Sequence, residues 1–207
     1  MGKIGLCFVN TSSQIEPDYV TKLAKKCEQI GLHSFWVIDR IAYDNLEPLS
    51  VLATAGAVTQ RIRIGTSVLL AALRHPVLLA KTVSTLDILS AGRLTLGIGF
   101  GSRENDFTSV EVSFKGRGRR AEEAIALMKR LWTEERVTHR GKFYQVENTV
   151  FGPRPVPSPT HLDGGRGRNR FEACGQASRW LHMQKQRHPG IPVSVGKDQR
   201  VCPGGGT

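Results

Sequence analysis

The 207-residue sequence has few cysteines, a deficit of acidic residues and no long apolar run. Its four cysteines show neither the pairing of a disulfide framework nor the spacing of metal ligands. No apolar segment is long enough to span a bilayer, and the first residues lead into a strand pattern rather than a secretory leader. These absences predict a cytoplasmic protein without a membrane partner. The hydrophobic content of 40% suits one domain with a real core.

The acidic deficit, 18 Asp and Glu against 29 Lys and Arg, gives a net charge of +11. A charge of this size usually suggests nucleic acid as a partner. However, residues 160–207 hold eight basic and three acidic residues, which is +5 of the total. This segment lacks the interleaved aromatics of single-strand binders and a helix long enough to read a groove. We therefore expect no nucleic-acid partner, and a nucleic-acid-binding module is the weakest alternative.

Apolar strand patterns alternate with helical patterns between residues 3 and 134. Strands are expected at 3–9, 34–38, 61–70 and 93–100, and helices at 17–30, 48–59, 76–89 and 119–134. This alternation predicts a parallel sheet. Because no glycine fingerprint follows the first strand, the pattern favours the (β/α)8 barrel over a doubly wound dinucleotide fold. A complete barrel needs about 250 residues, so the predicted fold is an incomplete α/β barrel of about four βα units.

A turn, a buried strand and a glycine-lined strand end follow one another in residues 89–101. Gly97, Gly99 and Gly101 remove side chains where a planar ligand or another backbone could come close. From the pattern alone, a strand that packs in a barrel without a ligand remains an alternative.

Four segments occur in an order that resembles the luciferase-like monooxygenase superfamily. They are Ser-Phe-Trp-Val-Ile-Asp at 34–39, Ile-Gly-Thr-Ser-Val at 64–68, Arg-His-Pro at 74–76 and Ser-Ala-Gly-Arg-Leu-Thr-Leu-Gly-Ile-Gly at 90–99. The resemblance covers residues 1–159. It implies a (β/α)8 barrel that binds FMN or the deazaflavin coenzyme F420 at the C-terminal ends of the strands. The implied function is a flavin- or deazaflavin-dependent oxidoreductase or monooxygenase.

The same resemblance implies which residues contact the cofactor ring. They are Asp39, Ser67, Val68, Gly99 and Gly101. Asp39 would act as the catalytic carboxylate that orients the ring or holds a proton; the residues alone equally allow it to cap Asn45 or a loop amide. The Ser67–Val68 peptide would be a non-prolyl cis bond that forms a bulge behind the ring, with an ordinary strand end as the alternative.

Two arginines stand near these residues. Arg40 occupies a position where the resemblance expects histidine, and it is assigned to substrate contact. Because arginine stays protonated, Arg40 cannot serve as a general base at ordinary pH. Arg74 either pairs with a phosphate or is a solvated residue at a helix start.

Residues 160–207 lack apolar periodicity. Read one base later, codons for residues 159–165 can spell Pro-Pro-Ile-Trp-Met-Gly-Gly, and those for 170–180 can spell Ala-Leu-Lys-Arg-Ala-Ala-Lys-Leu-Ala-Asp-Gly. Both strings resemble the superfamily's fifth strand, its glycine loop and the next helix. We therefore predict that 160–207 is an out-of-frame, disordered tail after an N-terminal barrel part, 1–159.

The predicted tail has a consequence for activity. In relatives, the glycine loop after the fifth strand receives the cofactor's phosphate, so the expected oxidoreductase is truncated and impaired. The alternative is a non-catalytic barrel remnant without cofactor binding, with unpaired edges at its first and fourth strands. A homodimer is also left open.

Overall fold

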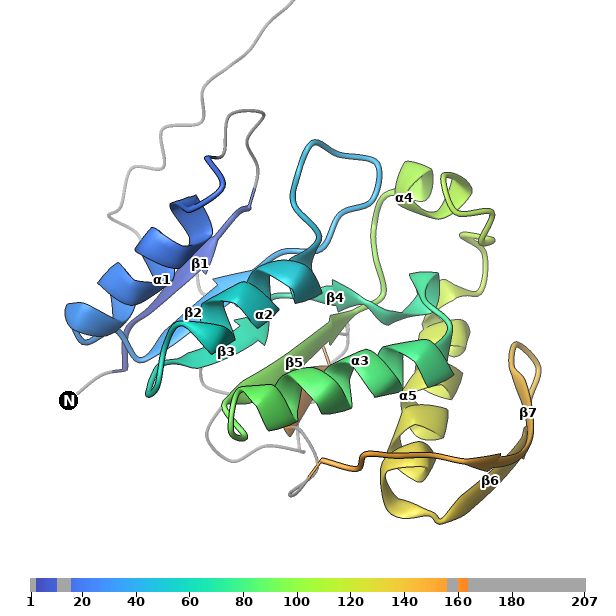
Figure 1. Cartoon of the computed structure of the whole chain (residues 1–207). Coiled ribbons are helices and arrows are strands. Elements are labelled where there is room, and N and C mark those ends of the chain that lie inside the picture. The colour runs from blue at the N-terminus through green and yellow to red at the C-terminus, as the bar shows by residue number, and fades with distance from the viewer. Residues whose placement is uncertain (1–2, 11–15, 156–159, 164–207) are drawn as a thin grey trace, which may run out of the picture.

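The computed structural model describes residues 3–10, 16–155 and 160–163. In this part of the chain the main sheet has six strands, and every pair in it is parallel (Figure 1). The strands are β1 (Gly5–Phe8), β2 (Ser34–Val37), β3 (Arg63–Thr66), β4 (Leu69–Leu70), β5 (Leu94–Gly99) and β8 (Thr160–Asp163). β2 lies between β1 and β3, and both β3 and β4 pair with β5. The predicted parallel sheet is confirmed.

The helices follow the strands as the alternation predicts. They are α1 (Tyr19–Gln29), α2 (Pro48–Ala57), α3 (Pro76–Leu89), the short α4 (Glu104–Thr108) and α5 (Arg117–Thr133), with a 3-10 turn η1 (Ala71–Leu73) after β4. Both α2 and α3 begin at a proline, whose fixed φ suits the first helical position. Helices α1, α2 and α3 lie along the same face of the sheet (Figure 1). Within the described ranges, none of these helices is long and apolar enough to cross a membrane.

The sheet remains open rather than closing into a barrel. In the described part of the chain, β1 and β8 each pair with a single neighbour. The four βα units and the incomplete barrel expected from the sequence are therefore found.

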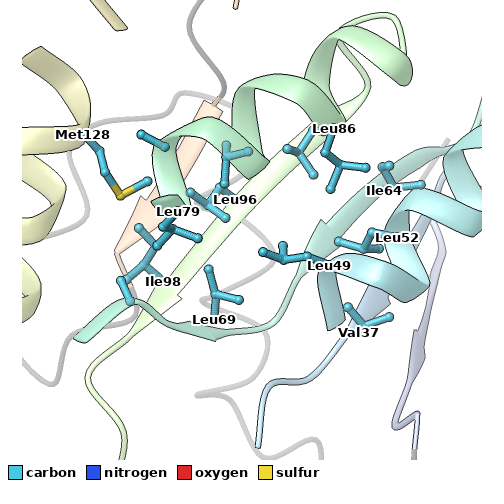
Figure 2. Close-up of a cluster of buried hydrophobic side chains, with 14 of the residues drawn as sticks. Val37, Leu49, Leu52, Ile64, Leu69, Leu79, Leu86, Leu96, Ile98 and Met128 are labelled. Atoms are coloured by element: carbon cyan, nitrogen blue, oxygen red, sulfur yellow. The ribbon is translucent and has the colours of Figure 1, made fainter. Parts of the chain in front are cut away.

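The core lies between the sheet and its helices (Figure 2). Alternate residues of β2, β3 and β5 supply the sheet side of this core, since successive side chains of a strand point to opposite faces. They are Phe35, Val37, Ile64, Leu94, Leu96 and Ile98. The helices contribute Leu52, Leu79 and Met128, each at most 2% exposed. Burying a side chain of this size stabilises the fold by about 1.5–3 kcal/mol.

The single strand predicted at 61–70 is wrong, because the chain leaves the sheet after Thr66 and returns at Leu69. β3 pairs with the first half of β5, and β4 pairs with its last two residues. Between them the Ser67–Val68 peptide is cis, which confirms what the family resemblance implies. A Cβ on Gly97 would lie 2.1 Å from the carbonyl oxygen of Thr66. Gly97 therefore makes room for a neighbouring backbone, one of its two predicted uses.

The first four residues of the predicted tail form β8, which pairs with β5 along Thr95 to Ile98. β5 consequently has strand neighbours on both sides, and the unpaired fourth-strand edge expected of a remnant is wrong. Residues 164–207 lie outside the described residues. An out-of-frame, disordered tail stays a prediction.

An antiparallel hairpin, β6 (Arg136–Arg140) and β7 (Gln145–Val150), follows α5, as expected for residues 136–151. The Glu123 carboxylate of α5 accepts hydrogen bonds from the backbone N–H groups of Lys142, Phe143 and Tyr144. Burial alone would raise the pKa of Glu123, but these bonds and the contact with His139 lower it below the ordinary 4.5. A helix carboxylate thus anchors the hairpin loop.

The Glu123→Gln variant should be less stable than the native chain by about 1.5–3 kcal/mol at pH 7, the scale of a hydrogen bond to a charged group. Because the folded pKa lies below the unfolded one, the carboxylate contributes fully above pH 4.5. That contribution is lost as the pH falls through the folded pKa, so the difference between the two proteins should narrow there. Urea unfolding of both proteins, at pH 7 and in the acid range, measures this difference in the free energy of unfolding. Glu147→Gln, at a side chain 82% exposed, is the control; a gap that does not change with pH would contradict the assignment.

A methyl group at position 97 should destabilise the sheet. We expect Gly97→Ala to cost about 1–3 kcal/mol, since its Cβ meets a backbone oxygen that cannot move independently of β3. The control is Gly118→Ala in α5, where a Cβ has no atom within 4 Å and alanine favours the helix. The urea unfolding midpoint should therefore fall for Gly97→Ala and stay equal or rise for Gly118→Ala. A Gly97→Ala midpoint equal to that of the native chain would disprove the close approach.

Candidate functional site

A pocket of about 600 Å³ opens beyond the ends of β2, β3 and β5. Its volume lies in the range of small-molecule sites, about 300–1,000 Å³. All the residues expected at the site line it: Asp39, Arg40, Ser67, Val68, Gly99 and Gly101. Parallel strands carry their C-terminal ends to the same edge of the sheet, which explains why segments distant in sequence meet here. The loop after β2 and the segment that contains α4 extend beyond this same edge (Figure 1).

The Asp39 side chain is fully buried directly after β2. The backbone N–H of Leu70 donates to its Oδ2 at 2.8 Å. Arg74 donates to both carboxylate oxygens, from Nη1 to Oδ2 at 2.5 Å and from Nη2 to Oδ1 at 3.1 Å. Asp39 thus binds a backbone amide of the strand β4, whereas the predicted alternatives for a cap are Asn45 or a loop amide. With both oxygens accepting from protein donors, the geometry favours a positioning role; the catalytic role stays a prediction.

Arg74 is the partner that sequence reasoning missed. Its side chain is 18% exposed, and it also donates from Nη2 to Glu47 at 3.1 Å. Burial would lower the pKa of Arg74, but the hydrogen bonds and negative charges of Asp39 and Glu47 outweigh it and raise the pKa. The solvated helix start is therefore wrong, and the two terminal nitrogens are bound to carboxylates rather than free for a phosphate. Glu47 in turn accepts from the N–H of Ser50 and caps α2.

A second buried carboxylate, Asp106 of α4, holds the loop after β2. Its Oδ1 accepts from the backbone N–H groups of Ile41 and Ala42, at 3.0 and 2.9 Å. Its Oδ2 accepts from Nε of Arg40 at 3.2 Å, and the Arg40 guanidinium lies 4.5 Å from the centre of the Tyr43 ring. No sequence signal marks Asp106, because its partners are more than 60 residues away and two of them are backbone amides. It fixes the arginine predicted to contact substrate.

Two side chains, Val68 and Phe107, occupy the space beside the glycines that line the pocket. A Cβ on Gly99 would lie 2.2 Å from Cγ2 of Val68. A Cβ on Gly101, whose φ is +74°, would lie 2.7 Å from the Phe107 ring. These glycines therefore admit protein side chains, and Val68 rather than an exposed backbone covers Gly99.

The pocket residues suit a planar heteroaromatic ring better than a metal ion. Ile38, Val68 and Leu70 provide apolar surface, and Asp39 and Arg40 add fixed polar groups at one side. No cluster of three or more His, Cys, Asp or Glu side chains in the described ranges is placed to hold a metal.

Replacing Arg74 by methionine should leave the buried Asp39 carboxylate without its ion pair. Breaking a buried pair from one side typically costs about 3–5 kcal/mol, and we expect Arg74→Met to lower the free energy of unfolding by about 3 kcal/mol. Adding Asp39→Asn to this variant should recover part of the loss, since no buried charge then remains unpaired. Urea unfolding of the two single variants and the double variant measures the coupling; strictly additive effects would contradict a direct pair.

Comparison with known proteins identifies a family model and sequence relatives that match most of the chain. The sequence model described as luciferase-like monooxygenase matches residues 5–189, which extends past residue 159. The F420-dependent glucose-6-phosphate dehydrogenase of Kineococcus radiotolerans is 36% identical over 166 residues, which cover 75% of this chain and 49% of that protein.

Solved structures agree with this placement. Monooxygenase RslO1 from Streptomyces bottropensis is 28% identical, with a TM-score of 0.71 over 78% of this chain and 53% of its own. The oxygenating constituent of 3,6-diketocamphane monooxygenase from Pseudomonas putida, in complex with FMN, has 19% identity and a TM-score of 0.70 over 83% and 52%. The latter likeness shows the fold alone. The chain spans about half the length of the relatives that it matches.

Proposed function

Because the chain belongs to the luciferase-like monooxygenase family, we propose that residues 3–163 carry the ring-binding part of an oxidoreductase that uses coenzyme F420 or FMN. The observation that carries the proposal is that every predicted site residue lines one and the same pocket. The relatives include F420-dependent dehydrogenases and an FMN-complexed monooxygenase, which supports either cofactor. The proposal includes a small-molecule substrate and a cytoplasmic location; a homodimer stays a prediction.

The chain's own residues supply position rather than acid–base chemistry. Val68 and the Ser67–Val68 bulge form the surface on which the cofactor ring would lie, and Asp39 ties the end of β2 to Leu70 of β4 and to Arg74. The bound cofactor would supply hydride transfer or oxygen activation. Arg40 stays charged and cannot accept the proton of an alcohol, but its guanidinium is suited to donate hydrogen bonds to a substrate oxygen.

The proposal also concerns the affinity of this chain for the phosphate-bearing cofactors FMN and F420. Phosphate sites in proteins draw on backbone N–H groups of glycine loops and helix N-termini. The described residues offer the ring pocket, whereas the loop expected to receive the phosphate falls after β8. We expect this chain to bind FMN and F420 more weakly than a full-length relative does, yet measurably. A non-catalytic remnant would bind neither.

A variant that fills the pocket tests the proposal. Ser102 and Ser109 are both exposed and lie in the same segment, but only Ser102 lines the pocket. Ser102→Trp should weaken FMN and F420 binding at least tenfold by occupying their space, while Ser109→Trp should leave it unchanged. Titration of each cofactor against the three proteins, followed by cofactor fluorescence, gives the dissociation constants.

The outcomes separate the alternatives. No binding by the native chain at any accessible concentration would support the remnant. Equal weakening by both tryptophan variants, or by neither, would mean that the cofactor binds elsewhere and would refute the pocket assignment.

A further inference from the structure

The charges that line the pocket do not balance. Three arginines and two aspartates line it: Arg40, Arg103, Arg117, Asp39 and Asp106. Arg74, from outside the lining, pairs with Asp39, so this carboxylate offers no charge to the other arginines. Asp106 is likewise committed, since one of its oxygens accepts two backbone amides and the other accepts Arg40. Two guanidinium groups are left over.

Among the described residues, neither Arg103 nor Arg117 has a carboxylate partner. Arg117 is bound to neutral groups: Nε donates to the Gly101 carbonyl at 2.9 Å and Nη1 to the Phe114 carbonyl at 3.4 Å. Its guanidinium also lies 3.8 Å from the centre of the Phe114 ring. These contacts fix the guanidinium plane at the pocket wall, and within the described part of the chain Nη2 has no acceptor. Arg103 lines the same pocket, is exposed, and its side chain has no hydrogen-bond partner among the described residues.

An arginine held by neutral acceptors keeps its full charge and presents the remaining N–H groups in a fixed direction. Such a group binds the oxygens of phosphate or carboxylate through short, charge-assisted hydrogen bonds. A second arginine that lines the same pocket adds electrostatic attraction, which is strongest at low ionic strength.

We propose that the pocket contains an anion subsite, in which Arg103 and Arg117 bind a phosphate or carboxylate group of a small-molecule ligand. The inference rests on the proposed function, because it assigns an anionic group to a ligand of the same pocket. The anion belongs either to the substrate or to the cofactor.

Two pairs of probes, each differing in one phosphate, test the subsite. FMN is compared with riboflavin, and glucose 6-phosphate with glucose, the second pair in the presence of saturating riboflavin. Isothermal titration of the full chain at low ionic strength gives the affinity ratio within each pair. We expect the phosphorylated member of at least one pair to bind several-fold more tightly, and the responding pair identifies which molecule carries the anion.

The variants are Arg103→Gln, Arg117→Gln and, as a matched control, Arg119→Gln. Arg119 is exposed and lies in the same segment, but it does not line the pocket. Its substitution by glutamine removes the same charge. Arg103→Gln should reduce the phosphate preference at least threefold and leave riboflavin binding unchanged. Arg117→Gln should reduce it at least tenfold. Because Arg117 also bonds to backbone carbonyls, the exposed Arg103 provides the decisive variant should Arg117→Gln fail to fold.

Equal ratios in all proteins, or the same loss in Arg119→Gln, would overturn the subsite. Riboflavin binding with no phosphate preference would reject the subsite and leave the proposed function standing. Arginine-dependent phosphate binding by a chain that does not bind riboflavin would retain the subsite and reject the proposed function.

Discussion

The site depends on one buried charge, the Asp39 carboxylate at the end of β2. A carboxylate without water is costly unless its oxygens are bonded, and here Leu70 and Arg74 supply those bonds. Through Arg74 the same interaction reaches Glu47 and the first turn of α2. The end of β2, the segment of β4 and η1, and the start of α2 are thereby fixed against one another beside the pocket.

Around this centre, Asp106 does for the loop after β2 what Asp39 does for β4. Each aspartate accepts hydrogen bonds from both a backbone N–H and an arginine. Asp106 divides them between its two oxygens, whereas Oδ2 of Asp39 accepts from Leu70 and Arg74 together. Preorganisation of this kind reduces the entropy lost on binding.

Sequence reasoning predicted the sheet well where local patterns determine it, and the residues that the resemblance implied for the site line one pocket. Pro76 and Leu89 bound α3 as expected, since proline favours the first helical position, and the alternation of Leu94, Leu96 and Ile98 predicted β5. The break between β3 and β4 was not predictable from apolar pattern alone, because Ser67 and Val68 suit a strand. Asp106 and the role of Arg74 escaped prediction for another reason. Their partners, Arg40 and Asp39, are distant in sequence, and the ion pairs become visible only in the folded chain.

Val68 and Gly99 occupy one shared volume, since a methyl group on the glycine would overlap the valine. The width of the pocket is therefore set by a side chain, while the strand beneath it stays constant. A smaller residue at position 68 together with a larger one at position 99 would change which side chain covers this part of the pocket. The backbone hydrogen bonds of the sheet would stay the same. In an evolving lineage these positions should change together, and their combined size would record the shape of the molecule that each member accommodates.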